Sequence, residues 1–487
     1  IAKMVPNRPG IYLEKALQEN PDLKAEYDSN RDVQDLIDDA LLLEGLVVHT
    51  GIHAAGIIIA DKDISDYIPI MYDQKEKTWV TQFDMTECEA EGLLKMDFLG
   101  LDNLIIIENT LKDIERIHGR KIALSDIDLN NKEEVNEVMK NIFAKGRTKA
   151  IFQFESVGMR NLLKRFQPNS IEDLILLNAA YRPGPLQYLD EIIDIKHKRK
   201  KPHYICSSMK SILELTYGKP IYQEQIMRMF NQIGGFSLGE SDIIRRGMSK
   251  KKIEEIEKYL PPFKEQLIKA GAKPEDAEKF CEELIEFANY AFNKSHSAAY
   301  AIIAYYTAWL KHYYPVEYMA NVLSNSSSEK LPVYIKECRD MGIKVLPPSV
   351  NESGRAFTPI GKDSIRFGLA GVKNVGKSCN DIIKSRESDG KFLSLKDFIK
   401  RMVEMNSRAV YKRELESLIM TGALDGFGLN RKQMMSGCVK YVKNLKEYIK
   451  KKETAKRQET IEKARQKAEA PHFDPRISEF RKEYILK

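Results

Sequence analysis

Cysteine is scarce in this 487-residue chain, and its six cysteines stand far apart. No CxxC pair or Cys/His spacing is present, which argues against a zinc site and against a disulfide framework. Isolated cysteines of this kind are typical of a reducing compartment. The sequence therefore predicts a cytoplasmic protein.

Long hydrophobic runs are also missing. No apolar stretch reaches the 18 or so residues that a membrane-spanning helix needs, so the sequence predicts no membrane association. The first residues, "IAKMVPNRPG", contain neither an initiator Met nor a signal-peptide pattern, from which we expect the chain to be a fragment. No internal repeat is visible. The net charge of +6 does not by itself indicate a nucleic-acid partner.

The length predicts about three domains. Apolar spacing is helical from 11 to 46, strand-like from 51 to 101, and helical again from 102 to 325. Short strands and small helices follow Pro347-Pro348, and a charged helix begins near Lys440. The sequence predicts a multidomain, mainly α fold with a small α/β part. The final charged helix is more typical of a solvated connector than of a binding tail.

One carboxylate stands in an unusual place. In "LLKMDFLGLDN", Asp97 lies within an apolar run, with Lys95 two residues before it. Residues two apart on a strand share one face. The pair is therefore either a satisfied ion pair or one half of a larger site. Two other acidic pairs, Asp61 with Asp63 and Asp126 with Asp128, stand in polar, turn-like segments and are better explained as surface residues.

Polar and basic clusters in the helical region suit phosphate groups. In "FNKSHSAAYA", Lys294, Ser295 and His296 stand at a helix start, where N–H groups can bind an anion; a plain N-cap with a solvated lysine is equally consistent. In "IIRRGMSKKK", Arg245 and Arg246 precede further cations, a pattern that can clamp phosphates or simply form a solvated face. The further cations are Lys250, Lys251 and Lys252.

Two loops could contact nucleic acid. In "NAAYRPGPLQ", Tyr181 and Arg182 precede a Pro-Gly-Pro turn, which suits base stacking and phosphate contact as well as an ordinary exposed turn. In "FGLAGVKNVGKSCNDIIKSR", a hairpin flanked by Lys373 and Lys377 can direct backbone N–H groups at a DNA phosphate.

Several segments together resemble one family. The ordered motifs "HTGIHAAGIII", "TQFD", "LLKMDFLGL", "AIFQFES", "YRPGPLQ", "YGKPIYQEQIM", "IIRRGMSKKK", "FNKSHSAAYA" and "MGIKVLPPSVN" are similar to those of bacterial DNA polymerase III alpha subunits, the C-family replicative polymerases. The resemblance covers residues 1 to about 435. It implies DNA-templated addition of dNMP from dNTP to a primer, with release of pyrophosphate.

The resemblance also gives Asp97 a role. In the family a palm similar to that of polymerase beta-type nucleotidyltransferases carries three catalytic aspartates, and Asp97 matches the third. The two upstream aspartates have no counterpart in this chain. The implied cofactor is a pair of Mg²⁺ ions, for which Asp97 supplies one ligand, and the fragment is expected to be inactive by itself. Lys95 is then a triphosphate contact and a counter-charge to Asp97.

The remaining roles follow from the same resemblance. Nucleotide-binding residues are expected among the fingers positions, and DNA-binding residues in the fingers and the hairpin. The first set is Lys95, Arg182, Arg245, Arg246, Lys294, Ser295 and His296; the second is Tyr181, Lys250, Lys251, Lys373, Asn374, Val375, Gly376 and Lys377. Asn374 stands where the family hairpin usually has its first Gly, which puts phosphate binding there in question, although Asn tolerates positive φ.

The implied domains are the end of the thumb, the C-terminal part of the palm, the helical fingers, a helix–hairpin–helix region and the charged connector. Their expected bounds are 1–52, 53–104, 105–345, 346–435 and 436–487. Expected partners are primer–template DNA and dNTP, with the sliding clamp and clamp loader binding through segments that are absent here. The alternative is a non-catalytic DNA-binding protein with a helix–hairpin–helix module, which would bind DNA in a salt-dependent way without needing dNTP.

Overall fold

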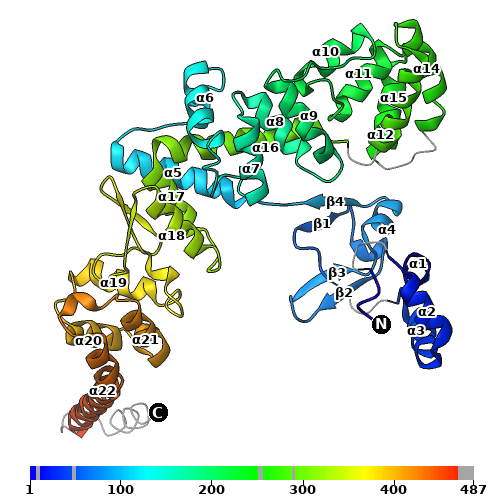
Figure 1. The fold of residues 1–487 in the computed structure, drawn as a ribbon. Coiled ribbons are helices and arrows are strands. Elements are labelled where there is room, and N and C mark those ends of the chain that lie inside the picture. Colours follow the sequence, from blue (N-terminus) through cyan, green and yellow to red (C-terminus); the bar gives the residue numbers. More distant parts are fainter. Residues whose placement is uncertain (7–10, 47–50, 250–255, 288–290, 470–487) are drawn as a thin grey trace. The chain divides into compact units, whose positions relative to one another are not determined.

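The computed structural model describes residues 1–487 except 7–10, 47–50, 250–255, 288–290 and 470–487. The described residues are mainly helical, with short strands in three small sheets (Figure 1). They divide into two compact units, Ile1–Gly100 and Leu101–Lys487. The mainly α architecture with a small α/β part agrees with the sequence prediction.

The first unit begins with three short helices around a small core. They are α1 (Leu13–Glu19), α2 (Pro21–Ser29) and α3 (Arg31–Leu43). The side chains of Asn20 and Asn30 accept hydrogen bonds from backbone N–H groups at the starts of α2 and α3. Such caps satisfy donors that a helix start leaves open. The core consists of Ala16, Leu23, Val33 and Ile37.

The strand-like segment of this unit forms two antiparallel pairs. Its elements are β1 (Gly56–Ile59), β2 (Ile70–Asp73), β3 (Thr78–Thr81), α4 (Met85–Ala90) and β4 (Leu94–Asp97). β2 and β3 form a hairpin, and β1 pairs with β4. All four strands lie within the strand-like stretch 51–101 that the sequence predicted. Asp84 and Glu87 form a capping box that starts α4 just before β4.

The β1–β4 register fixes the surroundings of Asp97. Gly56 stands opposite Asp97, and Ile58 stands opposite Lys95. Because alternate residues of a strand point to the same side, these four residues share one face of the ribbon. Ile57 and Met96 lie on the other face.

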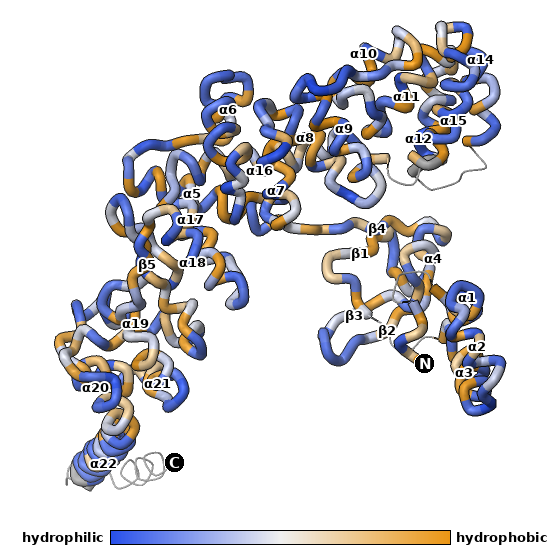
Figure 2. The backbone as a smooth tube through the Cα atoms, viewed as in Figure 1, coloured by the Kyte–Doolittle hydropathy of each residue, from blue (hydrophilic) through white to orange (hydrophobic). Residues whose placement is uncertain are grey.

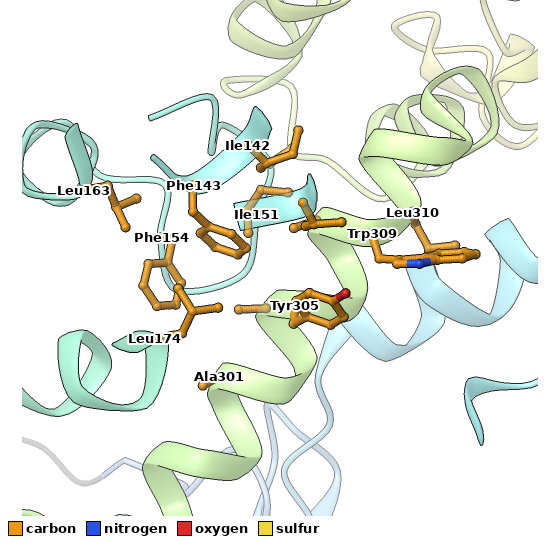
Figure 3. Close-up of a cluster of buried hydrophobic side chains, with 14 of the residues drawn as sticks. Ile142, Phe143, Ile151, Phe154, Leu163, Leu174, Ala301, Tyr305, Trp309 and Leu310 are labelled. Carbon is orange, nitrogen blue, oxygen red and sulfur yellow. The ribbon is translucent and has the colours of Figure 1, made fainter. Parts of the chain in front are cut away.

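The second unit is built of helices in three groups, each with its own core. The first group comprises α5 (Asp102–His118), α6 (Lys132–Val138), α7 (Val157–Phe166), α8 (Ile171–Ala180), α9 (Leu189–Lys196), α16 (Lys294–Tyr313), α17 (Pro315–Ser324) and α18 (Leu331–Asp340). Its core joins segments far apart in sequence: Phe143, Phe154 and Leu174 pack with Tyr305 of α16 (Figure 3).

Helix α16 is central to that group. Its sequence from Ala298 to Leu310 is apolar all round, and Ala301, Ala304, Tyr305, Ala308 and Leu310 are all fully buried. One buried residue is charged. Lys311 Nζ donates to the carbonyl oxygens of Arg147 and Lys149 and to Glu337 Oε1 at 3.0, 2.8 and 2.7 Å. These bonds compensate the cost of burying an ammonium group.

A second helix group has a separate core. It consists of α10 (Lys210–Leu213), α11 (Gln223–Gln232), α12 (Leu238–Ser249), α14 (Leu260–Lys269) and α15 (Pro274–Phe287). Phe230 and Phe263 stack there with ring centroids 4.2 Å apart. This group holds Arg245 and Arg246 on α12, whereas Arg182, Lys294, Ser295 and His296 belong to the first group.

The third group follows a small sheet. The strands β5 (Lys344–Leu346), β6 (Thr358–Ile360) and β7 (Ser364–Arg366) are ordered β5-β7-β6. The helices are α19 (Cys379–Asp389), α20 (Leu395–Glu404), α21 (Lys412–Met420) and the long α22 (Arg431–Glu469). Hydrophilic residues are frequent around α22 (Figure 2). Among the described helices, none has an apolar stretch long enough to cross a bilayer.

Candidate active site

Asp97 and Lys95 form an ion pair on one face of the β1–β4 ribbon. The Lys95 Nζ and Asp97 Oδ1 atoms are 2.7 Å apart. The lysine side chain is 14% exposed and the aspartate side chain 40% exposed, so the carboxylate stays accessible while the ammonium is largely covered. The hydrogen bond from Lys95 is the main cause that lowers the pKa of Asp97. This geometry confirms that the two side chains share a face and keeps the carboxylate ionised.

Gly56 makes room for this pair. A Cβ atom on Gly56 would lie 2.8 Å from His53 Nδ1, 2.8 Å from Lys95 Cε and 3.1 Å from Asp97 Oδ1. The two approaches at 2.8 Å are shorter than packed atoms normally allow, so a side chain at this position would have to displace the His53 ring or the end of the Lys95 side chain. The His53 Nδ1 atom accepts hydrogen bonds from the N–H groups of Gly56 and Ala55, at 2.7 and 3.2 Å. The ring is thereby fixed beside the ion pair.

His53 and Gly56 were not selected from the sequence as site residues, although both lie in the quoted "HTGIHAAGIII" motif. The available signal was a glycine inside a strand pattern, which often marks a close approach. The contact itself depends on the pairing of β1 with β4, two strands 35 or more residues apart.

The donor atoms on this face do not complete a magnesium site. Within the described residues, no group of three or more His, Cys, Asp or Glu side chains is arranged to hold a metal ion. Magnesium prefers near-octahedral oxygen coordination. Asp97 is one such ligand, and its neighbour Lys95 is a cation. These residues therefore do not hold a pair of ions by themselves.

A second cluster forms where the end of α8 meets the start of α16. The Arg182 guanidinium lies over the Phe292 ring, 3.8 Å from its centroid. Phe292 contacts His296 edge to face, and His296 packs against Tyr300 with centroids 4.3 Å apart. Tyr300 in turn packs on Phe152. The structure thus brings Arg182 and His296 together through an aromatic row that the sequence analysis did not identify.

The start of α16 differs from the predicted anion cradle. Asn293 is the N-cap and accepts from the His296 N–H at 2.9 Å, while both oxygens of Glu224 accept from the Lys294 N–H at 3.0 Å. Both N–H groups already have a protein acceptor, which agrees with the N-cap alternative, while phosphate contact by the Lys294, Ser295 and His296 side chains stays a prediction. The side chains remain accessible: Ser295 and His296 are exposed, and the Lys294 side chain is partly exposed, 3.1 Å from Glu172.

The Tyr181 side chain packs against α7 and is only partly exposed. A Cβ atom on Gly158 of α7 would lie only 1.9 Å from the Tyr181 hydroxyl oxygen. The tyrosine is therefore packed against α7, and its ring is half-buried. Base stacking by this ring stays a prediction, and only the part of the ring not packed on α7 is open to it.

The two arginines of α12 share one acid on their own helix. Arg245 and Arg246 contact Asp242 at 2.9 and 2.7 Å, and the hydrogen bond from Arg245 is the main cause that lowers the pKa of Asp242. Their charges are therefore partly compensated. The predicted DNA contacts Lys250 and Lys251, with Lys252, lie outside the described residues.

The hairpin of the third group has a conformation suited to an anion. Val372 and Val375 are buried, whereas Lys373 and Lys377 are exposed. Asn374 has φ of 69°, and its side-chain amide donates to Ser417 Oγ at 3.1 Å. Asparagine thus adopts the left-handed conformation for which glycine is the usual residue.

Four backbone donors of this hairpin have no protein acceptor within the described residues: the N–H groups of Lys373, Asn374, Gly376 and Lys377. A Cβ atom on Gly376 would meet only the Ala370 carbonyl oxygen, at 3.6 Å. They fall in two consecutive pairs on either side of Val375, whose N–H donates to the Val372 carbonyl, and successive free N–H groups in a turn are typical of an anion-binding concavity.

Models of known protein families match three regions of this chain. Residues 1–100 match the model of the bacterial DNA polymerase III alpha NTPase domain, and residues 103–271 match that of the finger domain of the same subunit. Residues 342–434 match a helix-hairpin-helix motif model. The candidate residues of all three clusters fall within these matches, except those at 292–300.

Curated relatives are similar over most of the chain. The DNA polymerase III subunit alpha of Thermus aquaticus is 41% identical over 438 residues, which cover 88% of this chain and 35% of the relative. Those of Bacillus subtilis and Escherichia coli are each 39% identical, over 90% of this chain and 38% of the relative. The chain therefore belongs to the family of bacterial DNA polymerase III alpha subunits, and it spans somewhat more than a third of the length of these relatives.

Proposed function

We propose that this chain supplies the carboxylate Asp97 and the nucleotide-binding fingers of a DNA-templated DNA polymerase. The observation that carries the proposal is the accessible, ionised Asp97 carboxylate held by Lys95 over Gly56. A carboxylate that stays charged while its partner is covered suits binding of a cation. We further propose the thumb, palm, fingers, hairpin and connector bounds given above as the domain organisation.

The reaction is the attack of a primer 3′-oxygen on the α-phosphorus of a dNTP. A P–O bond forms to the primer, the bond to pyrophosphate breaks, and the 3′-hydroxyl loses its proton. In this class of reaction, two bound metal ions supply charge stabilisation and activation of the hydroxyl. Since Asp97 is one ligand of such a pair, we expect the chain as printed to bind DNA without extending a primer.

The residues of the fingers would stabilise the triphosphate. Arg182 has a planar guanidinium fixed over Phe292, which suits bidentate contact with phosphate oxygens. Lys294 and His296 stand on the adjacent start of α16. Arg245 and Arg246 would have to exchange Asp242 for a phosphate, since both contact that acid.

The decisive experiment compares Asp97→Asn with the unmodified sequence in a polypeptide extended to the full length of its relatives. We expect primer extension to fall on the order of 10³-fold or more, because ligands that act as a unit are not replaceable singly. Binding of primer–template should stay the same within twofold. Unchanged extension would refute the assignment.

Asp61→Asn is the matched control. Asp61 belongs to the same unit, lies two residues after the end of β1, and accepts a hydrogen bond from the Tyr67 hydroxyl on the surface. The same charge is removed, so the control reports any general effect of charge or folding. Extension by this variant should match that of the unmodified protein.

A non-catalytic DNA-binding role is the second candidate. It is favoured by the free N–H groups of the 373–377 hairpin and by the single carboxylate on the ribbon face. The discriminating measurement is the effect of the correct dNTP on primer–template affinity. A polymerase ternary complex is stabilised by the nucleotide that matches the template, whereas a simple DNA-binding module is indifferent to it.

A further inference from the structure

Helix α22 carries an excess of positive charge that the rest of the chain does not share. From Arg431 to Glu469 it contains 13 lysines and arginines against five glutamates, although the whole chain has a net charge of only +6. The positive charge of this protein is therefore concentrated in one helix.

The first turns of α22 are part of the hairpin module. Met434, Cys438 and Val442 are buried in the same core as Val375 of the hairpin. Further along, Lys446 Nζ lies 4.8 Å from the ring centroid of Tyr411, which directly precedes α21. The helix is thus anchored to the element that presents free N–H groups, and it extends out from the α19–α21 helices (Figure 1).

The cations of α22 are mostly uncompensated. Between 440 and 465 there are ten lysines and arginines. Lys463 pairs with Glu459 at 2.7 Å, and Lys446 lies over Tyr411; the other eight make no ion pair with another described residue. A solvated connector helix is usually stabilised by alternating charges at i,i+4.

Like charges also stand next to one another on the helix surface. Lys443, Lys446, Lys450 and Arg457 follow the spacing i, i+3, i+7 and i+14, which places them along one face. Neighbouring like charges cost a few tenths of a kcal/mol per pair. An external polyanion would relieve this repulsion.

We infer that α22 is a DNA-backbone-binding helix that lengthens the duplex contact of the hairpin module. This inference rests on the proposed DNA-binding role of the chain. Its ligand is the phosphate backbone of double-stranded DNA, recognised by charge and without base readout. The part from Lys450 to Arg465, beyond the last residue packed on the hairpin module, is about 24 Å long at 1.5 Å per residue, roughly the length of seven base pairs.

The test measures binding of a 25-base-pair duplex by the full chain as a function of salt concentration. The variant is Lys443→Gln/Lys446→Gln/Lys450→Gln/Arg457→Gln, since glutamine keeps helix propensity. Each lost phosphate contact lowers the slope of log K against log salt by about 0.9, so we expect the slope to fall by about 3 to 4. Circular dichroism checks that helix content is unchanged.

The matched control removes four other exposed lysines of the same unit: Lys121→Gln/Lys132→Gln/Lys140→Gln/Lys145→Gln. The net charge of the two variants is equal. An unchanged slope in the control, with a reduced slope in the α22 variant, supports the inference. Equal slopes in the two variants, or no effect of the α22 substitutions, overturn it.

A hairpin variant separates this inference from the proposed function. Lys373→Gln/Lys377→Gln should weaken duplex binding whether or not α22 takes part. If the hairpin variant weakens binding and the α22 variant does not, the helix is a connector and the proposed function stands. If the unmodified chain does not bind the duplex, both the inference and the DNA-binding role fail.

Discussion

The β1–β4 ribbon and the region around α16 differ in how much apolar surface they bury. In the first unit, the small cores consist of Ala16, Leu23, Val33 and Ile37, and of Ile68, Cys88 and Leu93. The ribbon face away from Asp97 is apolar yet exposed, with Ile57 at 52% and Met96 at 42%. In the second unit, α16 is buried along most of its length among aromatic and aliphatic side chains.

This difference shows how the candidate site residues are held in position in each region. Around α16, close packing fixes the positions of Arg182 and His296 through Phe292 and Tyr300. On the ribbon, few apolar groups are buried, so the carboxylate is positioned by Lys95, His53 and the space above Gly56. Truncation of a buried side chain should therefore cost more stability around α16 than truncation of a side chain on the ribbon.

The largest expected contrast is between two truncations. Phe154→Ala removes a fully buried ring from the α16 core and should lower the free energy of unfolding by about 3–5 kcal/mol. Ile57→Ala removes a half-exposed side chain and should change it by less than about 0.5 kcal/mol. Chemical denaturation of both variants measures the difference. Similar losses would show that the ribbon is packed as tightly as the helices.

Lys311→Met tests whether polar bonds contribute to the α16 region. The variant leaves two carbonyl oxygens without their donor, and Glu337 keeps only Lys149 at 2.9 Å. Removing one partner of a buried pair should cost about 3 kcal/mol of unfolding free energy. Lys336→Met, which removes an exposed i,i+4 partner of Asp340, is the control and should cost well under 1 kcal/mol.

Gly56→Ala should act on activity more than on stability. The added methyl group displaces His53, Lys95 or Asp97, and a displacement of about 1 Å can reduce turnover about 100-fold. Primer extension by the full-length polypeptide measures this. Gly100→Ala in the same unit meets no atom within 4 Å and should leave extension unchanged. Equal activity of both variants would contradict the role of Gly56.

Substitution of Asn374 should change the unfolding free energy less than the core substitutions do, because it alters backbone conformation and leaves the core intact. Its φ of 69° is tolerated by asparagine and glycine but costs other residues about 1 kcal/mol. Asn374→Ala should therefore lower the unfolding free energy by about 1 kcal/mol and lose the Ser417 bond. Asn374→Gly should cost less. Thermal unfolding of the two variants ranks them, and the reverse order would exclude positive φ as the cause.

The smallest expected effect is a change in the pKa of Asp97 when its partner Lys95 is replaced. Lys95→Met removes the main cause of the lowered pKa of Asp97, so this pKa should rise toward its ordinary value. A carboxylate with a lowered folded-state pKa stabilises the fold above its unfolded pKa of about 3.9, and the contribution is lost as pH falls through the folded value. Titration by NMR should show protonation at higher pH in the variant. An unchanged pKa would mean that Lys95 does not contact Asp97 in solution.

Much of the local structure could be predicted from periodicity and capping chemistry. The four strands of the first unit, the α16 helix and the shared face of Lys95 and Asp97 follow from residue spacing alone. The anion cradle at Lys294 could not be judged in this way, because its competitor, Glu224, is 70 residues away in sequence. Nor could the partial burial of Tyr181 be predicted from spacing, because its hydroxyl packs against Gly158 of another helix.

The order of residues alone determined which side chains are neighbours along a strand or a helix, because backbone geometry repeats every two or 3.6 residues. The family assignment likewise followed from ordered motifs. Only the tertiary structure decided which donors and charges are already used, as with the Lys294 N–H that donates to Glu224 of α11, and which remain open, as in the 373–377 hairpin and on α22. Hydrogen bonds and ion pairs saturate, so the availability of a group depends on partners that distant segments bring to it.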